Sequence, residues 1–177
     1  MNFNPILIVA GEPNSIFFEI FFKTIKNNKF KNPIILIASK KILFLQMKKL
    51  NFRKKINILN YKRFNKKNLD DKCINLININ YDQKYAFEKI TSKSNNYINK
   101  SFEVAFKIIK KGISTKLING PISKKSFLKK NYLGITEFLT KKFKSKSNAM
   151  LIYNKKLSVC PITTHLPINL VPKSINK

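Results

Sequence analysis

The chain of 177 residues is 44% hydrophobic and 25% charged, a composition that is sufficient for one domain with a hydrophobic core. Its 36 lysines and arginines outnumber eight acidic residues, which gives a formal net charge of +28. No apolar run approaches the roughly 18 residues that span a bilayer, and no N-terminal segment has the pattern of a signal peptide, so we expect a cytoplasmic protein with no membrane partner.

Strands and helices are predicted in alternation through the first third of the chain. Short continuous apolar runs predict strands buried on both faces, and apolar residues near a spacing of 3.6 predict amphipathic helices. The first helix carries Ile16, Ile20 and Phe21 on its predicted apolar side. In chain order the patterns give a strand at 5–10, a helix at 15–26, a strand at 33–38, a helix at 40–50 and a weaker strand at 56–59.

The middle of the chain is more polar. Residues 61–72 form an Asn/Lys-rich connector, and residues 73–79 alternate between apolar and polar side chains. This alternation predicts a strand at an exposed edge of a sheet. Residues 91–98 are predicted as a loop. Cys73 and Cys160 are isolated from each other and form no CxxC pair, which predicts two buried core thiols.

The clearest helix is predicted from about Tyr97 to Lys111. Phe102, Ala105, Phe106 and Ile109 fall at i, i+3, i+4 and i+7, which is the pattern of a core-facing stripe. The glycine at position 112 is suited to end the helix as a C-terminal cap. Strands are then predicted at 117–119, 149–153 and 157–163, the last two joined by a turn at 154–155.

This order of elements predicts an α/β fold with a largely parallel sheet and flanking helices. The sequence contains no internal repeat and no clear linker, so residues 1–177 are predicted to form a single α/β region. In such sheets ligands bind at the carboxyl ends of the strands, where loops lead into helix N-termini. Three segments meet that description: residues 11–15, 119–124 and 163–165.

The segment Asn119-Gly120-Pro121-Ile122-Ser123-Lys124 leaves its strand through a tight turn. Ser123 is suited to cap the next helix, and the free N–H groups with Lys124 are suited to hold a phosphate. A simple cap beside a solvated lysine explains the same spacing. Thr136 followed by Glu137 is likewise the pattern of an ordinary N-cap with an acidic residue in the first turn.

His165 is the only histidine of the chain, in the run Thr163-Thr164-His165-Leu166-Pro167. At a strand end its imidazole could reach a divalent cation, or it could be a structural hydrogen-bonding group. Metal catalysis normally needs about three protein ligands, and the sequence offers no second histidine. The residues alone therefore indicate an incomplete site.

The chain resembles the 4-hydroxythreonine-4-phosphate dehydrogenase family of vitamin B6 biosynthesis. The resemblance is carried by the order and spacing of Gly11-Glu12-Pro13, the 119–124 segment, Gly134-Ile135-Thr136-Glu137-Phe138-Leu139 and Thr163-Thr164-His165-Leu166-Pro167. It runs from near residue 5 to the end of the chain and corresponds to the N-terminal half of a family member, so we expect a partial chain. It implies a fold related to the isocitrate and isopropylmalate dehydrogenases.

The resemblance also implies an activity. Family members are homodimers that oxidise 4-phosphooxy-L-threonine with NAD or NADP and a divalent metal (Zn, Mg or Co). Loss of carbon dioxide from the β-keto acid then gives 3-amino-2-oxopropyl phosphate, on the way to pyridoxal phosphate. With only half of a family member present, we expect the isolated chain to be inactive.

Three positions match functional residues of the family. His165 matches its first metal-binding histidine, and Thr136 matches a substrate-binding threonine. Ile135 stands where the family has a substrate-binding histidine, and isoleucine can neither donate a hydrogen bond nor carry charge. The first loop also departs from the family pattern Gly-Asp/Glu-Pro-Ala-Gly-Ile-Gly-Pro-Glu, because residues 14–19 replace two glycines and a proline.

Two alternatives remain. The charge of +28 would suit a small basic protein that binds nucleic acid or another polyanion. We disfavour nucleic acid because only Arg53 and Arg63 are arginine, the lysines extend through the whole chain, and the Lys/Asn/Ile/Phe bias is typical of an AT-rich coding sequence. The second alternative is a non-catalytic relative of the family, in which Ile135 marks the loss of activity.

Overall fold

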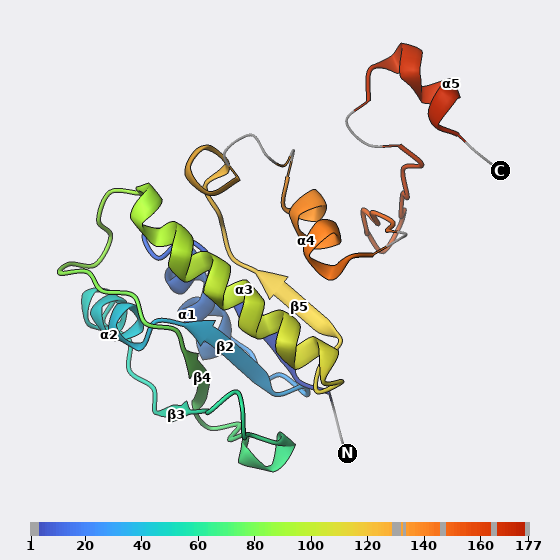
Figure 1. The fold of residues 1–177 in the computed structure, drawn as a ribbon. Helices are drawn as coiled ribbons and strands as arrows, with labels where there is room; N and C mark the ends of the chain where they lie inside the picture. Colours follow the sequence, from blue (N-terminus) through green and yellow to red (C-terminus); the bar gives the residue numbers. More distant parts are fainter. Residues whose placement is uncertain (1–3, 129–131, 133, 146–147, 164–165, 176–177) are drawn as a thin grey trace. The chain divides into compact units, whose positions relative to one another are not determined.

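The computed structural model describes residues 4–128, 132, 134–145, 148–163 and 166–175. By compactness the chain divides into two units, residues 1–127 and 128–177, and each unit is described by itself. The larger unit contains the sheet and three of the helices (Figure 1). Within the described residues, no helix is long and apolar enough to cross a membrane.

The larger unit is built on a five-stranded sheet in which every pair of neighbouring strands is parallel. The strand order is β3-β4-β2-β1-β5. All five strands predicted before residue 120 are present, which confirms the α/β fold with a parallel sheet. Their bounds are Ile6–Val9 (β1), Ile34–Ala38 (β2), Ile56–Ile58 (β3), Ile74–Asn78 (β4) and Lys116–Asn119 (β5).

Helices cover both faces of this sheet. Figure 1 shows α3 (Asn95–Lys110) in front of the strands and α1 (Phe17–Asn27) behind them. The side chains of α1 and of α2 (Lys40–Lys49) share one hydrophobic cluster with the strands, so α2 lies on the same face as α1. This arrangement follows from short parallel connections, each of which crosses one face of the sheet.

The period of two along each strand divides the core into two layers. Ile8, Leu36 and Leu76 pack in the cluster with the α1 and α2 side chains. Their neighbours Leu7 and Ile37 are fully buried and, by alternation, face the other side of the sheet, where α3 packs on β1 and β2. Continuous apolar runs are therefore needed in the central strands, as the sequence predicted.

The predicted position of residues 73–79 at an exposed edge is wrong. Strand β4 lies inside the sheet, between β3 and β2, and only Asn78 among its residues is exposed. The polar residue that suggested an edge, Asn75, is buried, and its amide makes four hydrogen bonds. The Nδ2 atom donates to the backbone O of Ile34 (3.3 Å) and of Asp70 (3.0 Å), and Oδ1 accepts from Asn57 Nδ2 (2.8 Å) and Asp70 N (2.9 Å). A buried polar group whose partners are all present is tolerated in a core.

The apolar sides of two helices differ slightly from the predicted ones. In α1 the buried face consists of Phe17, Phe18, Phe21 and Phe22, whereas Ile16 and Ile20 are mostly exposed. Four phenylalanines on adjacent turns give a wider apolar surface than the stripe drawn through the isoleucines. In α3 the predicted stripe is confirmed except at its last position, where the neighbouring Ile108 is the fully buried residue. The residues predicted as a loop, 91–98, contain the 3₁₀ turn Ser92–Ser94 and the start of this helix.

Several shorter elements complete the description. Another 3₁₀ turn, Lys66–Asn68, lies in the predicted polar connector, and a π-helical turn, Lys124–Leu128, follows β5. The smaller unit contains α4 (Ile135–Phe143), a 3₁₀ turn at Ile168–Leu170 and α5 (Val171–Ser174). The two strands predicted at 149–153 and 157–163 are reduced to one antiparallel bridge, Ile152 to Val159, around the predicted turn. Both bridge residues are exposed, so no apolar core extends the pairing.

The prediction of two buried thiols is also wrong. Both cysteines are free, Cys160 is exposed, and Cys73 is half-buried. The Cys73 thiol donates to Asp70 Oδ2 at 3.0 Å, and this hydrogen bond raises the pKa of the thiol and lowers the pKa of the carboxyl. Cys73 therefore acts as a polar partner at the start of β4.

The buried amide of Asn75 gives the first testable prediction. We expect Asn75→Ala to lower the free energy of unfolding by about 2–3 kcal/mol, because it removes the four hydrogen bonds of a buried amide to three partly buried or exposed neighbours. Asn96→Ala, an exposed asparagine of α3, is the control and should cost less than about 1 kcal/mol. Urea unfolding followed by circular dichroism measures both. An equal loss of free energy of unfolding for the two substitutions would show that the hydrogen bonds of Asn75 do not stabilise the fold.

Candidate functional site

Two of the predicted loops lie next to each other at the carboxyl edge of the sheet. The loop at 11–15 follows β1, the segment at 120–124 follows β5, and the two strands are direct neighbours in the sheet. From β1 the chain continues into α1 behind the sheet, whereas β5 is reached through α3 in front of it (Figure 1). In open parallel sheets such a change of direction marks the usual position of a ligand site.

Glycine is required on both sides of this junction. Gly11 has a positive φ of 76°, and a Cβ atom there would lie 2.3 Å from the backbone O of Pro121. At Gly120 a Cβ atom would lie 2.1 Å from the backbone O of Ala10. Two backbone hydrogen bonds join the segments: Glu12 N donates to Pro121 O (2.8 Å) and Gly120 N donates to Val9 O (2.7 Å). The two strand ends are therefore held in direct backbone contact.

A buried acid lies beneath this junction. Glu12 is 2% exposed, and its carboxylate accepts a hydrogen bond from Ser94 Oγ at 2.7 Å and a longer one from Asn14 N at 3.3 Å. Ser94 is the residue that immediately precedes α3, so the carboxylate lies at the positive end of a helix of 16 residues. A buried carboxylate needs such partners, because burial without them is very costly.

The first loop keeps its shape without the glycines and the proline that the family pattern contains. Ser15 Oγ donates to Glu12 O (2.8 Å) and accepts from Phe17 N (3.3 Å), which closes a local turn. Phe17 and Phe18 fill the core beneath the loop, and neither is among the non-glycine residues with positive φ. The shape of this loop is thus fixed by side-chain hydrogen bonds and packing, whereas a glycine-rich loop would reach its shape through the conformational freedom of its backbone.

Two buried glutamines hold the same loop from other elements. Gln46 of α2 donates from Nε2 to Pro13 O at 2.7 Å, and Gln83 donates from Nε2 to Asn14 Oδ1 at 3.0 Å. Asn14 Oδ1 also accepts from Glu88 N at 2.9 Å. The loop after β1 is therefore tied to α2 and to the long connection that follows β4.

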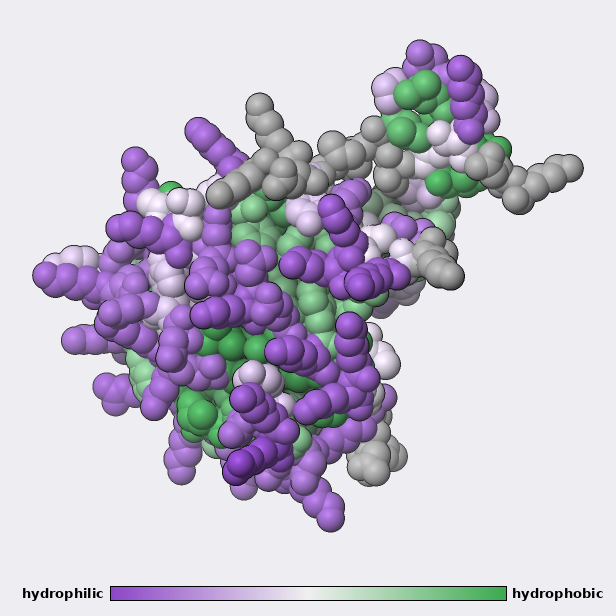
Figure 2. All heavy atoms as spheres, viewed as in Figure 1, coloured by the Kyte–Doolittle hydropathy of each residue, from purple (hydrophilic) through white to green (hydrophobic). Residues whose placement is uncertain are grey.

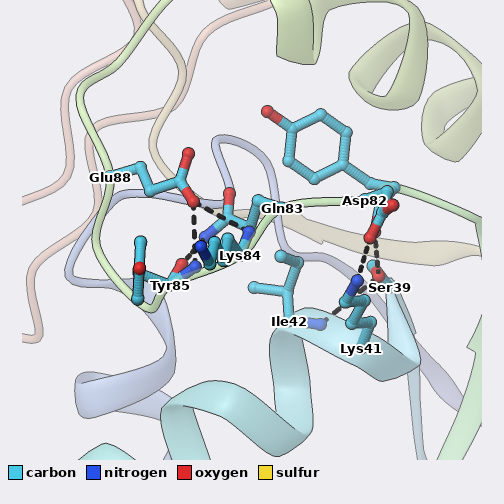
Figure 3. A network of polar contacts seen from close by, with 9 residues as sticks. Ser39, Lys41, Ile42, Asp82, Gln83, Lys84, Tyr85 and Glu88 are labelled. Carbon is cyan, nitrogen blue, oxygen red and sulfur yellow. Dashed lines mark hydrogen bonds and ion pairs between the residues drawn. The ribbon is translucent and has the colours of Figure 1, made fainter.

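That connection has its own polar network, shown in Figure 3. Glu88 Oε1 accepts from the backbone N of Lys84 and of Tyr85, both at 2.9 Å, and Lys41 forms an ion pair with Asp82. A hollow of about 640 Å³ beside it is lined by residues of the β2 and β4 ends, including Ser39 and Asn78.

Three amides at the α2 N-terminus already have partners within the chain at this hollow. Ser39 N donates to the Tyr97 hydroxyl (3.3 Å), Lys40 N to Asn78 Oδ1 (2.8 Å), and Ile42 N to Ser39 Oγ (3.4 Å). The helix N-terminus is therefore capped by the chain itself and is not a prepared anion site.

Two tyrosines lie side by side behind the junction. The rings of Tyr81 and Tyr97 are 5.2 Å apart between centroids. Burial raises the pKa of Tyr97 well above its usual range, and burial together with the nearby carboxylates of Glu12 and Glu88 raises the pKa of Tyr81. Both phenols are therefore neutral over the physiological range, and the Tyr97 hydroxyl serves as an acceptor for Ser39 N.

The predicted site residues of the smaller unit are partly described. Ile135 and Thr136 are consecutive, half-buried residues of the first turn of α4. The N-cap is Gly134, so the prediction that Thr136 caps this helix is wrong. Its hydroxyl has no hydrogen-bond partner among the described residues. His165 lies outside the described residues.

The segment after β5 behaves as a cap, as predicted. Ser123 Oγ accepts from Ser126 N at 3.1 Å, and Ser123 O accepts from Phe127 N at 2.9 Å. Lys124 is exposed.

The hydrogen bond between Glu12 and Ser94 could not be predicted from the sequence, because 82 residues separate the two. The only sequence signal was an acidic residue directly after a buried strand.

No group of three metal-ligating side chains occurs in the part of the chain that the structure describes. The sequence holds one histidine, so these 177 residues supply at most one imidazole to a metal. A metal centre of about three protein ligands therefore does not fit the described residues.

Comparison with known proteins gives a consistent result. Residues 29–177 match the family model described as "Pyridoxal phosphate biosynthetic protein PdxA". The 4-hydroxythreonine-4-phosphate dehydrogenase of Aquifex aeolicus is 32% identical over 174 residues, which cover 96% of this chain and 52% of the relative. The enzyme of the same name from a Sulfurihydrogenibium species is 30% identical, over 97% of this chain and 53% of the relative. The chain thus spans about half the length of the curated relatives it matches.

Solved structures agree on the fold. A 4-hydroxythreonine-4-phosphate dehydrogenase from Burkholderia phymatum superposes with a TM-score of 0.77 at 17% identity, over 98% of this chain and 54% of that chain. The Klebsiella pneumoniae enzyme gives a TM-score of 0.74 at 20% identity, over 98% and 54%. At these identities the likeness establishes the architecture.

The bond between Ser94 and Glu12 gives a second prediction. We expect Ser94→Ala to destabilise the protein by about 1–3 kcal/mol, because the buried carboxylate loses its shorter hydrogen bond. Ser101→Ala is the matched control: this serine is also buried on α3, but its hydroxyl donates to the helix carbonyl of Tyr97 and not to a carboxylate. Chemical unfolding of both variants tests the difference, and a control as destabilised as Ser94→Ala would contradict the assignment.

Tyr97 gives a prediction about pH. The pKa of its hydroxyl is raised in the folded protein, so its contribution to stability is complete below about pH 10 and is lost as the pH rises above the value of a free tyrosine. Above that pH we expect the wild-type free energy of unfolding to fall by up to about 1.4 kcal/mol per pH unit more than that of Tyr97→Phe. The exposed Tyr153→Phe should keep the wild-type slope. Parallel slopes for all three proteins would refute the effect.

Proposed function

The chain belongs to the PdxA family of pyridoxal phosphate biosynthetic proteins, and we propose that it supplies part of the active site of a 4-hydroxythreonine-4-phosphate dehydrogenase. The observation that carries this proposal is the similarity to enzymes of that name over 96% of the chain, together with the same fold in the solved structures. The substrate is then 4-phosphooxy-L-threonine, which is oxidised and decarboxylated to 3-amino-2-oxopropyl phosphate.

Thr136 is proposed as a substrate-binding residue. Its hydroxyl is half-buried on the first turn of α4 and can both donate and accept a hydrogen bond. Ile135, beside it, offers only apolar contact. A substrate oxygen that a histidine would bind therefore has no protein donor at this position, and we expect weaker substrate binding than in a sequence with histidine there.

The metal and the nucleotide are proposed for the complete enzyme. His165 is this chain's one candidate metal ligand, and the remaining ligands have to come from outside these 177 residues. The coenzyme is NAD or NADP and the metal Zn, Mg or Co, in a cytoplasmic homodimer. The residues described here fit neither group as a complete site, so no step of the reaction is assigned to them through the metal or the coenzyme.

A non-catalytic relative is the second candidate, and Ile135 is the observation that favours it. The backbone junction of Gly11 and Gly120 and the buried Glu12 serve the fold equally well in an enzyme and in an inactive relative. The two candidates therefore differ only in whether Thr136 and His165 still act on substrate.

A polypeptide of these 177 residues is expected to show no turnover with 4-phosphooxy-L-threonine, NAD or NADP and any of the three metals, because it supplies at most one histidine. Joined in frame to the second half of the Aquifex relative, the same residues should give a protein that reduces the nucleotide at a measurable rate. The second half of the relative alone is the control. Turnover by the 177 residues alone would overturn the first expectation.

Substitutions in that chimera separate the two candidates. Thr136→Ala should lower kcat/KM by about tenfold, which corresponds to the loss of about 1.4 kcal/mol of interaction with the transition state. Ile135→His should raise it. The exposed Thr24→Ala on α1 is the control and should leave the rate unchanged. A folded chimera that stays inactive even with Ile135→His would favour the non-catalytic relative.

A further inference from the structure

Lysines extend through the whole chain, but the net positive charge is concentrated in one part of it. Residues 20–69 contain fifteen of the 36 lysines and arginines, including both arginines, and none of the eight acidic residues. The other 127 residues share 21 cations and all eight acids. A uniform lysine bias explains a high total, but it does not explain fifty consecutive residues without one acid that carry more than half of the net charge.

The fold turns part of this segment into a groove. A hollow of about 590 Å³ lies at the amino end of the sheet, between the end of α1 and the residues that precede β2, β3 and β4. Four lysines line it, Lys26, Lys29, Lys54 and Lys72, against one acid, Asp71. Lys72 lies close enough to Asp70 to help lower the pKa of that carboxyl, whereas the salt bridges found among the described residues involve none of Lys26, Lys29 and Lys54. Their charge is therefore available to a phosphate-rich ligand.

An exposed aromatic ring lies in the same groove. Phe30 is 46% exposed and lines the hollow together with Asn27, whose side chain is also exposed. Lysines that follow a phosphate backbone beside an aromatic side chain on which a base can stack are the combination by which proteins hold single strands. Asparagine amides can add hydrogen bonds to base edges.

The groove is separate from the carboxyl-edge junction. It lies at the starts of the strands, whereas Gly11 and Gly120 follow the ends of β1 and β5. Figure 2 shows hydrophilic side chains covering much of the visible surface of the larger unit, with apolar patches between them. Charge alone is thus widespread, and the groove adds to it an exposed ring that lies among lysines and asparagines.

We propose that this groove binds single-stranded nucleic acid, with its lysines on the phosphates and Phe30 stacked on a base. The function is additional to that of the dehydrogenase family and does not depend on it. An inorganic polyphosphate shares the charge but has no base to stack, and an anionic membrane surface presents neither a strand nor a base. These ligands serve as the competing outcomes.

The test uses the full chain and a fluorescein-labelled oligouridylate of about 10 nucleotides, followed by fluorescence anisotropy over a range of salt concentrations. Lys29→Gln with Lys72→Gln should weaken binding by at least about tenfold at 0.1 M salt and reduce the log–log salt slope by about 1.4. Lys100→Gln with Lys107→Gln, two exposed lysines of α3, removes the same charge elsewhere and should weaken binding by no more than about twofold. Equal losses from the two pairs would overturn the proposal, because binding would then follow total charge.

The aromatic ring is tested separately. Phe30→Ala should weaken binding of the oligouridylate by at least about fivefold, Phe30→Trp should restore it, and binding of inorganic polyphosphate should be unchanged. The control is Tyr153→Ala, which removes a ring that is 72% exposed and does not line the groove. Oligonucleotide binding that is insensitive to Phe30, or tighter binding to phosphatidylserine vesicles than to the oligonucleotide, would overturn the assignment. Circular dichroism of each variant confirms that these surface substitutions leave the fold intact.

Discussion

The larger unit depends on the backbone contact between the ends of β1 and β5. Gly11 and Gly120 allow two strand ends to meet without side chains between them, and the hydrogen bonds of Glu12 N and Gly120 N join them. Because β5 is an edge strand paired only with β1, this contact continues the β1–β5 pairing beyond the ends of the two strands. It also fixes where the loop after β1 begins, and hence where Glu12 meets the N-terminus of α3 and where Asn14 meets the connection after β4. A side chain at either glycine would force these elements apart.

Much of this architecture could be predicted from the sequence, because its signals are local. Short apolar runs identify buried strands, and the predicted stripe of α3 needs only its own sixteen residues. The errors have a common cause, since each depends on what an element packs against. Asn75 suggests an exposed edge until its partners, Ile34, Asn57 and Asp70, are known. The two apolar segments beyond residue 148 have strand patterns, but one exposed antiparallel bridge is all that forms among their described residues.

The candidate site was predictable in position and not in its contacts. The rule that ligands gather at the carboxyl ends of parallel strands selects the loops after β1 and β5, and these two strands are neighbours in the sheet. It cannot reveal that Ser94, 82 residues from Glu12, supplies the hydroxyl that the buried carboxylate needs. It also cannot reveal that Gln46 and Gln83 hold Pro13 and Asn14 where the family pattern leads into glycines. Such contacts are set by three-dimensional packing, and their sequence separation leaves no periodic signal.

The residues of the junction and the residues of the proposed site support different conclusions. Gly11 and Gly120 are required because a side chain at either position would collide with the backbone of the other segment. Glu12 is required because its carboxylate accepts hydrogen bonds from the Ser94 hydroxyl and the Asn14 amide. None of these requirements involves a substrate. They would persist in any protein with this fold, active or not. Thr136, by contrast, has a half-buried hydroxyl without a partner among the described residues, and the fold gains nothing visible from it. The proposed activity of this chain therefore rests on Thr136 and His165. Ile135 is a stronger argument against activity than Gly11 and Gly120 are for it.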